Sequence, residues 1–312
     1  MKRAAAVVAV LSVVATACAD DGAGGPDKLR DDVPDPPEGG VQLVTPTFEV
    51  APGEEMFVCY RIDHVVDRDW YIINSTAYQM PNGHHTFVYF MEGDTSAIDP
   101  APHECGSLDM TNIRVAASGG SDGASFFIAD DVALLVPRGA ELWAQSHYIN
   151  ATDEPRTVQD VVNLTLVEPS AVREVASTFA QVDLTFALPP GQETVRTVEC
   201  APHQDMSVPW LLPHMHQWGN HYSIEIIDPD GQTTWSSEGE WAANLRNDFR
   251  VVELEQHLSL TPQHRLRTTC RWFNDEPETL LFPQEMCVTF FPFYPGDGAL
   301  WACDESGDVF RP

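Results

Sequence analysis

Two histidines separated by a single residue offer the clearest chemistry in this chain of 312 residues. His214 and His216 come just before Tyr222–Ile227, a segment rich in residues that favour strands. In an extended chain, residues i and i+2 project from the same face, so the two imidazoles can converge on one ion. Neutral imidazole binds copper, zinc, nickel and iron, and a lone His-x-His pair is common by chance. The identity of the site therefore depends on further ligands.

A second group of histidines lies in the first half of the chain. His84 and His85 are adjacent at the start of a strand-like segment, where neighbouring residues face opposite ways. Both can reach one ion only if a turn or a bulge redirects one of them, and we expect Gly83 to give the backbone that freedom. His147 lies in the apolar, strand-like segment 143–148, where an isolated histidine is more often part of the core. Together the three predict a compact, all-nitrogen site.

A methionine supplies the third candidate ligand for the His-x-His pair. Met286 lies inside the segment 283–288, which we interpret as another apolar strand. A methionine there usually fills a gap in the core. Beside His214 and His216 its soft thioether favours Cu(I) over zinc. A site of two histidines and one methionine with an open position can bind dioxygen when it is reduced.

The order of these motifs resembles a known family. His-His, Gln-x-His-Tyr, His-x-His-x-x-Gly and Glu-Met-Cys follow one another as in the type II copper, ascorbate-dependent monooxygenases, which include peptidylglycine α-hydroxylating monooxygenase and dopamine β-monooxygenase. The resemblance covers roughly residues 57–303. It implies two coppers per chain, an electron-supplying one and an oxygen-activating one. The implied ligands are His84, His85 and His147 for the first copper, and His214, His216 and Met286 for the second.

The resemblance also implies a fold and a reaction. The family has two jelly-roll-type β-sandwich domains that face each other across a solvent-filled cleft, with one copper site per domain. Its members hydroxylate a C–H bond with O2 and a one-electron donor such as ascorbate, because the metals carry chemistry that side chains lack. Gln145 matches a family position, and we expect it to help orient the histidine ligands without binding the metal itself.

Departures from the family pattern bear on the substrate. Peptide-hydroxylating relatives have an arginine two residues before the His-x-His pair, where this chain has Leu212. Their Asn and Tyr after the Met-Cys pair are replaced by Val288 and Phe290. We therefore expect a small organic substrate more apolar or aromatic than peptidylglycine. Trp210, Trp218 and Phe290 are candidates to line its pocket, although such residues in strands more often belong to the core.

The cysteines predict disulfides in an oxidising compartment. Of seven cysteines, six remain after Cys18, and none has the C-x-x-C spacing of a zinc or redox motif. Six cysteines allow fifteen pairings, so spacing alone does not decide among them. The family pattern implies three pairs and leaves no cysteine over, although two further disulfides of the family's first domain have no counterpart. The implied pairs are Cys59–Cys105, Cys200–Cys303 and Cys270–Cys287.

The N-terminus predicts export. Lys2 and Arg3 precede a short apolar run and the small residues 15–17, as in a secretory signal. The following Cys18 resembles the lipidated cysteine of bacterial lipoproteins, although Ala15 replaces the usual leucine. We expect a protein of the periplasm or cell surface that contacts the membrane only through this lipid anchor. The alternative is ordinary cleavage, with Cys18 left as a spare thiol.

The rest of the chain predicts an all-β protein. Short apolar segments alternate with Pro, Gly, Asn and Asp clusters, with hardly any helical period, which is typical of sandwiches and barrels. The polar, proline-containing segment 168–173 is the candidate domain boundary. The predicted parts are a signal peptide (1–17), an acidic Pro/Gly-rich tether (18–40), an N-terminal sandwich with the three-histidine site (41–172) and a C-terminal sandwich with the His-His-Met site (173–312).

Three functions remain open on the sequence. The formal net charge of −30 argues against nucleic acid and anionic lipid surfaces as partners. The leading hypothesis is an exported copper monooxygenase that acts on a small molecule. Its rival is a copper-binding or copper-buffering exported lipoprotein that has kept the ligands without turnover. The third is a zinc-binding or purely structural β-sandwich.

Overall fold

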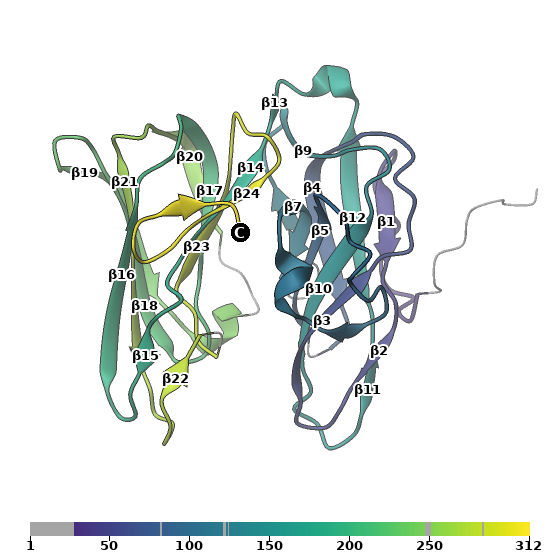
Figure 1. Ribbon diagram of the computed structural model, residues 1–312, viewed down its shortest axis with the longest axis horizontal. Coiled ribbons are helices and arrows are strands. Elements are labelled where there is room, and N and C mark those ends of the chain that lie inside the picture. The colour runs from purple at the N-terminus through teal and green to yellow at the C-terminus, as the bar shows by residue number, and fades with distance from the viewer. Residues whose placement is uncertain (1–27, 82, 121–122, 124, 247–250, 283) are drawn as a thin grey trace, which may run out of the picture.

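The computed structural model describes residues 28–312, except 82, 121–122, 124, 247–250 and 283 (Figure 1). These residues form strands joined by loops and three short 3-10 helices, so the all-β prediction is confirmed. No helix in the described ranges is long and apolar enough to cross a membrane. The predicted signal peptide, the lipidation site at Cys18 and the start of the tether lie outside them. The 3-10 helices are η1 (Ser107–Met110), η2 (Pro169–Ala171) and η3 (Ala243–Arg246).

The first half of the molecule is sandwich-like, with two layers around one core. Side chains from both layers, including Tyr60, Trp70 and Leu164, are buried together. One sheet has the strand order β1 (Val41–Val44), β12 (Asp160–Val167), β4 (Trp70–Gln79), β9 (Val132–Val136) and β13 (Glu174–Val175), with β8 (Ser125–Phe127) paired to β4. The other has the order β6 (His103–Glu104), β3 (Glu55–Arg61), β10 (Leu142–Ile149), β5 (Gly83–Met91) and β7 (Ile113–Gly119), and β2 (Phe48–Val50) pairs separately with β11 (Arg156–Val158).

The second half repeats this layered construction around its own core. Phe179, Trp272 and Phe291 are among its largest buried side chains. Its larger sheet has the order β20 (Val252–Leu260), β17 (Met206–His214), β23 (Val288–Phe293), β14 (Ser177–Val182), β24 (Leu300–Cys303) and β25 (Val309–Phe310). Its smaller sheet has the order β16 (Glu193–Cys200), β21 (Arg265–Phe273), β18 (Gly219–Ile227) and β19 (Thr233–Glu240), and β15 (Ala187–Leu188) pairs with β22 (Leu280–Leu281).

The chain passes from one half to the other at Ala176. β13 still adds to the first half, because it pairs in parallel with β9. β14 begins at Ser177 and lies within the larger sheet of the second half. The crossing therefore comes a few residues after the predicted boundary between residues 172 and 173.

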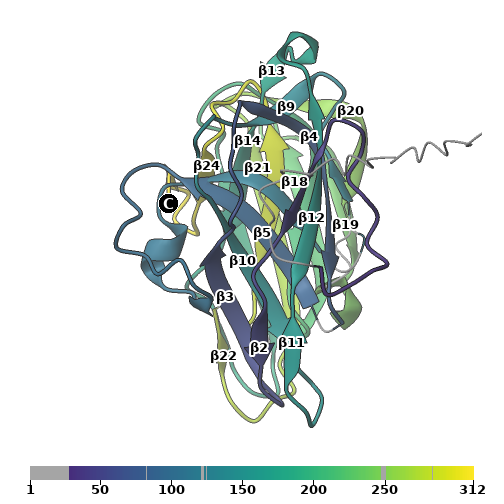
Figure 2. The same cartoon turned by 90° about the vertical axis from the view of Figure 1, so that its right-hand side faces the viewer.

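The two halves lie side by side and touch at several points (Figure 1). The chain's C-terminus lies between them, where the backbone N–H of Asn112 donates to the carbonyl of Pro312 at 2.8 Å. Trp210 of the second half donates its indole N–H to the carbonyl of Phe127 of the first at 2.7 Å. In the view of Figure 2 the first half lies in front of the second. These contacts place the inner faces of the halves close enough to share a site.

Three disulfides join the six cysteines that the structure describes. Their pairing, Cys59–Cys105, Cys200–Cys303 and Cys270–Cys287, confirms the pairing implied by the family pattern. Disulfides persist in oxidising compartments and are rare in reducing ones. The structure therefore supports an oxidising, extracytoplasmic location.

Candidate metal centre

A β-bulge brings the adjacent histidines to the same side. In the pairing of β5 with β10, His85 lies opposite His147, but the next pair is Gly83 with Tyr148. The register shifts by one residue, so His84 occupies the extra position of a bulge, which re-aims a side chain. The rings of His84 and His85 have centroids 4.8 Å and 5.0 Å from that of His147. The predicted redirection of one histidine is confirmed.

Gly83 contributes space rather than an unusual backbone angle. Its φ lies outside the left-handed region, so the predicted use of its conformational freedom is wrong. A Cβ at this position would instead lie 2.6 Å from Cβ of Gln79, a separation that real structures do not show. The bulge can form because the glycine lets the buried Gln79 side chain pass close to the backbone.

His147 is held by two side chains of the neighbouring strand β3. Its Nε2 lies 2.8 Å from Oε1 of Glu55, and its ring stacks on Phe57 with centroids 3.9 Å apart. A carboxylate that accepts from Nε2–H leaves the lone pair of the neutral ring on Nδ1. Neither residue was predicted from the sequence, and the signal that could have found them is the alternation that puts Glu55 and Phe57 on one face of β3. Gln145 lies on the same face of β10 as His147, and its amide donates to Sγ of Cys105 at 3.8 Å.

The His-x-His pair lies at the end of a strand rather than inside one. His214 is the last residue of β17, and His216 lies in the loop that leads to β18. The rings still approach, with centroids 5.2 Å apart. Nδ1 of His216 donates to the carbonyl of Gln284 at 2.9 Å, which makes Nε2 the nitrogen with the lone pair. The indole of Trp241 donates to the carbonyl of His216 at 2.7 Å and fixes the turn.

A buried carboxylate ties this turn to the segment that carries Met286. The side chain of Glu285 is fully buried and accepts the backbone N–H groups of His216, of Trp218 at 3.0 Å and of Met286 at 2.9 Å. Burial raises the pKa of Glu285 above its ordinary value, and the three N–H groups oppose that rise by stabilising the charged form. The sequence identified Glu285 only as part of the Glu-Met-Cys motif and did not predict these hydrogen bonds.

Met286 lies in a loop, and the prediction of a methionine inside a strand is wrong. β23 begins only at Val288, because Glu285 and the Cys270–Cys287 disulfide hold the preceding residues in another path. The position is nevertheless close to the His-x-His pair, since Val288 lies opposite His214 in the pairing of β17 with β23. Met286 and His214 line the same cavity between the halves.

The two predicted ligand sets adjoin each other across the boundary between the halves. The rings of His85 and His214 have centroids 6.4 Å apart, and those of His147 and His216 are 6.5 Å apart. At these rings the two halves are in close proximity, without the wide solvent-filled cleft that the family resemblance implies. The described side chains form no group of three or more His, Cys, Asp or Glu residues with ready metal-site geometry, so the rings must turn for three nitrogens to reach one ion. The donor chemistry, imidazole with one thioether, fits copper.

Comparisons with known proteins identify no family for this chain. No protein-family model matches the sequence, and no curated protein matches it. Among solved structures, the chain is similar to VP2 proteins of infectious bursal disease virus, at 9% and 10% identity over 86% of this chain and 72% and 75% of theirs, with TM-scores of 0.22. It is also similar to the exported protein XepA of PBSX, at 9% identity over 74% of this chain and 86% of that one, with a TM-score of 0.21. Likenesses this weak carry no argument.

A cavity of about 260 Å³ opens beside the histidines, and we call it the inner pocket. His85, His214 and Met286 contribute to its wall, as does Gln145. Of the three aromatic candidates for a substrate pocket, Trp210 and Phe290 line this cavity, whereas Trp218 packs against the core of the second half. The remaining lining residues are Phe57, Thr86, Phe87, Ser118, Gly119, Phe126, Leu212, Val288 and Leu300.

Proposed function

We propose that this chain is an exported, copper-dependent monooxygenase. It would hydroxylate a C–H bond of a small organic molecule with O2 and a one-electron donor such as ascorbate. The observation that carries the proposal is the convergence of His84, His85 and His147 with His214 and His216, from opposite halves, beside a pocket that Met286 also lines. Several imidazoles gathered beside one pocket are a candidate functional site, because their chemistry rather than the fold carries the function.

The finer architecture of the family belongs to the same proposal. Each half would be a jelly-roll-type domain with one copper, held by His84, His85 and His147 in the first and by His214, His216 and Met286 in the second. Copper bound at these residues would supply one-electron redox chemistry and the activation of O2, which amino-acid side chains do not provide. A lipid anchor at Cys18 would hold the enzyme at the membrane surface.

The chain's own residues would orient the ligands and shape the site. Glu55 orients the ring of His147 through Nε2, and the carbonyl of Gln284 orients that of His216 through Nδ1. Glu285 keeps the backbone after β17 beside Met286, so that the side chains of the second ligand set would need only to turn toward a metal. The apolar lining of the inner pocket would exclude water from the reacting bond.

The test combines metal content with turnover. The exported chain is loaded with copper and analysed for metal, then supplied with ascorbate, O2 and a library of small molecules, and the products are examined by mass spectrometry. We expect close to two coppers per chain and a product that has gained one oxygen atom, with O2 consumption that depends on the donor. His264→Ala, which changes a histidine outside the cluster, should behave as wild type.

The other outcomes separate the rival functions. Two coppers without any donor-dependent product would favour a copper-buffering protein over an enzyme. A preference for zinc, or no metal bound by the wild type at all, would contradict both. His84→Ala and His214→Ala should each lower the copper content by about one per chain, because each removes one ligand from a different set.

A further inference from the structure

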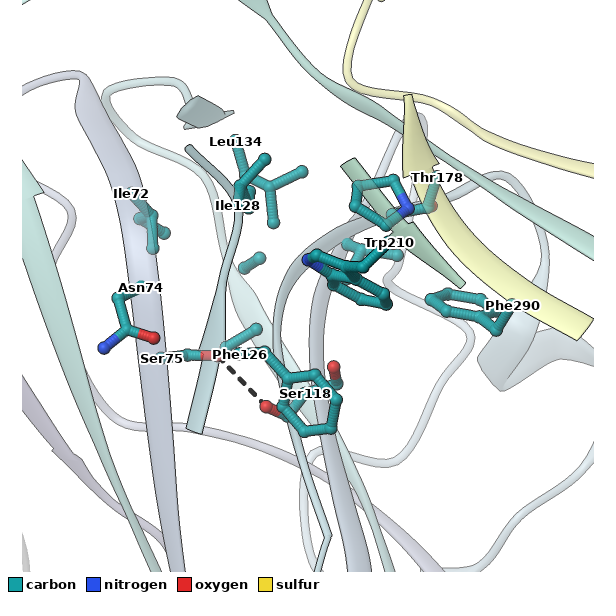
Figure 3. Close-up of a pocket in the computed structure, with 14 residues that line it drawn as sticks. Ile72, Asn74, Ser75, Ser118, Phe126, Ile128, Leu134, Thr178, Trp210 and Phe290 are labelled. Carbon is teal, nitrogen blue, oxygen red and sulfur yellow. Dashed lines mark hydrogen bonds between the residues drawn. The ribbon is translucent and has the colours of Figure 1, made fainter. Parts of the chain in front are cut away.

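Three cavities between the halves meet at one pair of aromatic side chains. Phe126 and Trp210 line the inner pocket, a larger groove of about 720 Å³ that we call the outer groove, and a small cavity of about 30 Å³. Figure 3 shows Trp210 and Phe290 on one side of the small cavity and Ile72 on the other. Phe126 and Trp210 thus separate the inner pocket from the outer groove, and we call the pair the aromatic wall.

The aromatic wall is fixed in place by contacts from both halves. Phe126 comes from β8 and Trp210 from β17, with ring centroids 5.7 Å apart and 7% and 9% of their surfaces exposed. The indole N–H of Trp210 donates to the carbonyl of Phe127 at 2.7 Å. Leu212 packs against the pair and completes a small buried cluster. Aromatic side chains held in this way form a rigid boundary of defined shape.

The inner pocket is chemically suited to an uncharged molecule. Of the described residues that line it, none is Asp, Glu, Lys or Arg. Its polar groups are hydroxyls, the amide of Gln145 and imidazoles, and the other lining side chains are aliphatic, aromatic or, at Met286, a thioether. A charged ligand would lose its hydration there without gaining an ion pair, which is costly. Asp130, Asp131 and Glu253 line the outer groove, so an anion would also be repelled on approach.

We propose that the inner pocket binds an uncharged, largely apolar small molecule and that the aromatic wall limits its size. The identification of this molecule as a substrate rests on the proposed function, whereas its binding does not. A dry apolar cavity of about 150 Å³ suffices for benzene. A pocket of about 260 Å³ therefore accommodates a benzene ring with a short side chain. A fused bicyclic ring with the same side chain would collide with Phe126 or Trp210.

The charge selectivity is tested by calorimetric titration of the exported chain, both metal-free and copper-loaded. The probes are 2-phenylethanol, the 2-phenylethylammonium ion and phenylacetate, which share one ring and differ in charge. We expect the neutral probe to bind at least about tenfold more tightly than either ion, because burial of a charge without a partner is unfavourable. Equal affinity for the three, or no binding of the neutral probe, would overturn the inference.

The role of the aromatic wall is tested by its size selectivity. In wild type, 2-(1-naphthyl)ethanol should bind more weakly than 2-phenylethanol. Trp210→Ala and the milder Phe126→Leu should shift the ratio of the two affinities toward the larger probe by about tenfold, because each opens the pocket toward the outer groove. Phe127→Ala is the matched control, since the exposed Phe127 side chain lines only the outer groove and its backbone carbonyl remains for Trp210.

The outcomes distinguish this inference from the proposed function. If Phe127→Ala shifts the ratio as far as Phe126→Leu does, the aromatic wall does not set the size limit. If the neutral probe binds as expected but the copper-loaded chain makes no hydroxylated product, the inference about the inner pocket is supported and the monooxygenase proposal is contradicted. If a product forms but charged probes bind equally well, only the inference about the pocket is wrong.

Discussion

Nε2 of His147 lies 2.8 Å from Oε1 of Glu55, and the two side chains come from neighbouring strands of one sheet. A carboxylate on one nitrogen of an imidazole fixes the tautomer and the direction in which the other nitrogen points. The ring is also stacked on Phe57, so it has little freedom to rotate. Glu55 therefore presents Nδ1 of His147 toward the side on which the rings of His84 and His85 lie.

Replacement of this carboxylate should weaken metal binding in the first half. We expect Glu55→Gln to lower the copper affinity of the three-histidine set by about 10- to 100-fold, as is typical of partners that orient a ligand. Stability should change little, because the Glu55 side chain is half exposed. Competition titration with a copper chelator measures the affinity. Glu49→Gln is the control, since Glu49 is exposed on another strand, and an equal loss in both variants would contradict a role for Glu55.

The bulge at His84 should depend on the absence of a side chain at residue 83. Gly83→Ala forces a Cβ against the buried Gln79, so we expect a loss of about 1–3 kcal/mol of unfolding free energy and a weaker first copper site. Chemical denaturation and copper titration measure the two effects. Gly106→Ala is the matched control, because a Cβ there would meet its nearest atom at 3.5 Å. A Gly83→Ala protein with wild-type copper affinity would show that the bulge is not needed for the site.

Much of the architecture could be predicted because it depends on local patterns. Short apolar segments separated by turn residues identified an all-β chain, and the segments containing His85 and His147 form the predicted strands. The need for a bulge between His84 and His85 followed from the two-residue period of a strand, and the structure contains it. The disulfides, by contrast, came from the family pattern, because spacing alone left the pairing open.

The residues that orient the ligands could not be predicted because their roles depend on tertiary position. Glu285 acts through three backbone N–H groups, two of which belong to a turn almost seventy residues earlier in the chain. Glu55 reaches His147 only through the register of β3 with β10. Met286 was assigned to a strand because its neighbours are apolar, whereas the contacts of Glu285 keep it in a loop. The segment that contains Phe126 has no motif that would connect it to Trp210.

Loss of the hydrogen bonds that the Glu285 carboxylate accepts from three backbone N–H groups should affect both stability and the second metal site. In Glu285→Gln an amide N–H₂ faces backbone N–H groups, so at least one of the three hydrogen bonds is lost inside the protein. We expect the free energy of unfolding to fall by about 1.5–3 kcal/mol, the range for hydrogen bonds to charged groups. Urea denaturation measures this loss. The exposed Glu278→Gln is the control, and copper titration should show a selective defect at the His214, His216 and Met286 set.

Replacement of Met286 should abolish turnover while the three-histidine set still binds copper. Met286→Ala removes the thioether but leaves the rings of His84, His85 and His147 untouched, since these lie in the other half. We therefore expect the variant to keep the copper of the three-histidine set and to lose hydroxylation, because the site that handles O2 has lost its soft ligand. Copper analysis and product detection by mass spectrometry measure the two properties. Normal turnover in Met286→Ala would mean that the oxygen site has been assigned to the wrong residues.

A histidine far from the ligand cluster should make stability depend on pH. His203 stacks on Trp301 with ring centroids 3.8 Å apart, and burial lowers its pKa below the usual 6.5. A lowered pKa means that the unfolded chain takes up a proton before the folded one does. The stabilising contribution of neutral His203 is therefore fully present above pH 6.5 and is lost as the pH falls from there through the pKa of the folded state. His203→Phe keeps the stack but cannot be protonated, so urea midpoints should fall less than in wild type between pH 7.5 and pH 5. An equal fall in wild type and His203→Phe would show that His203 does not cause the pH dependence.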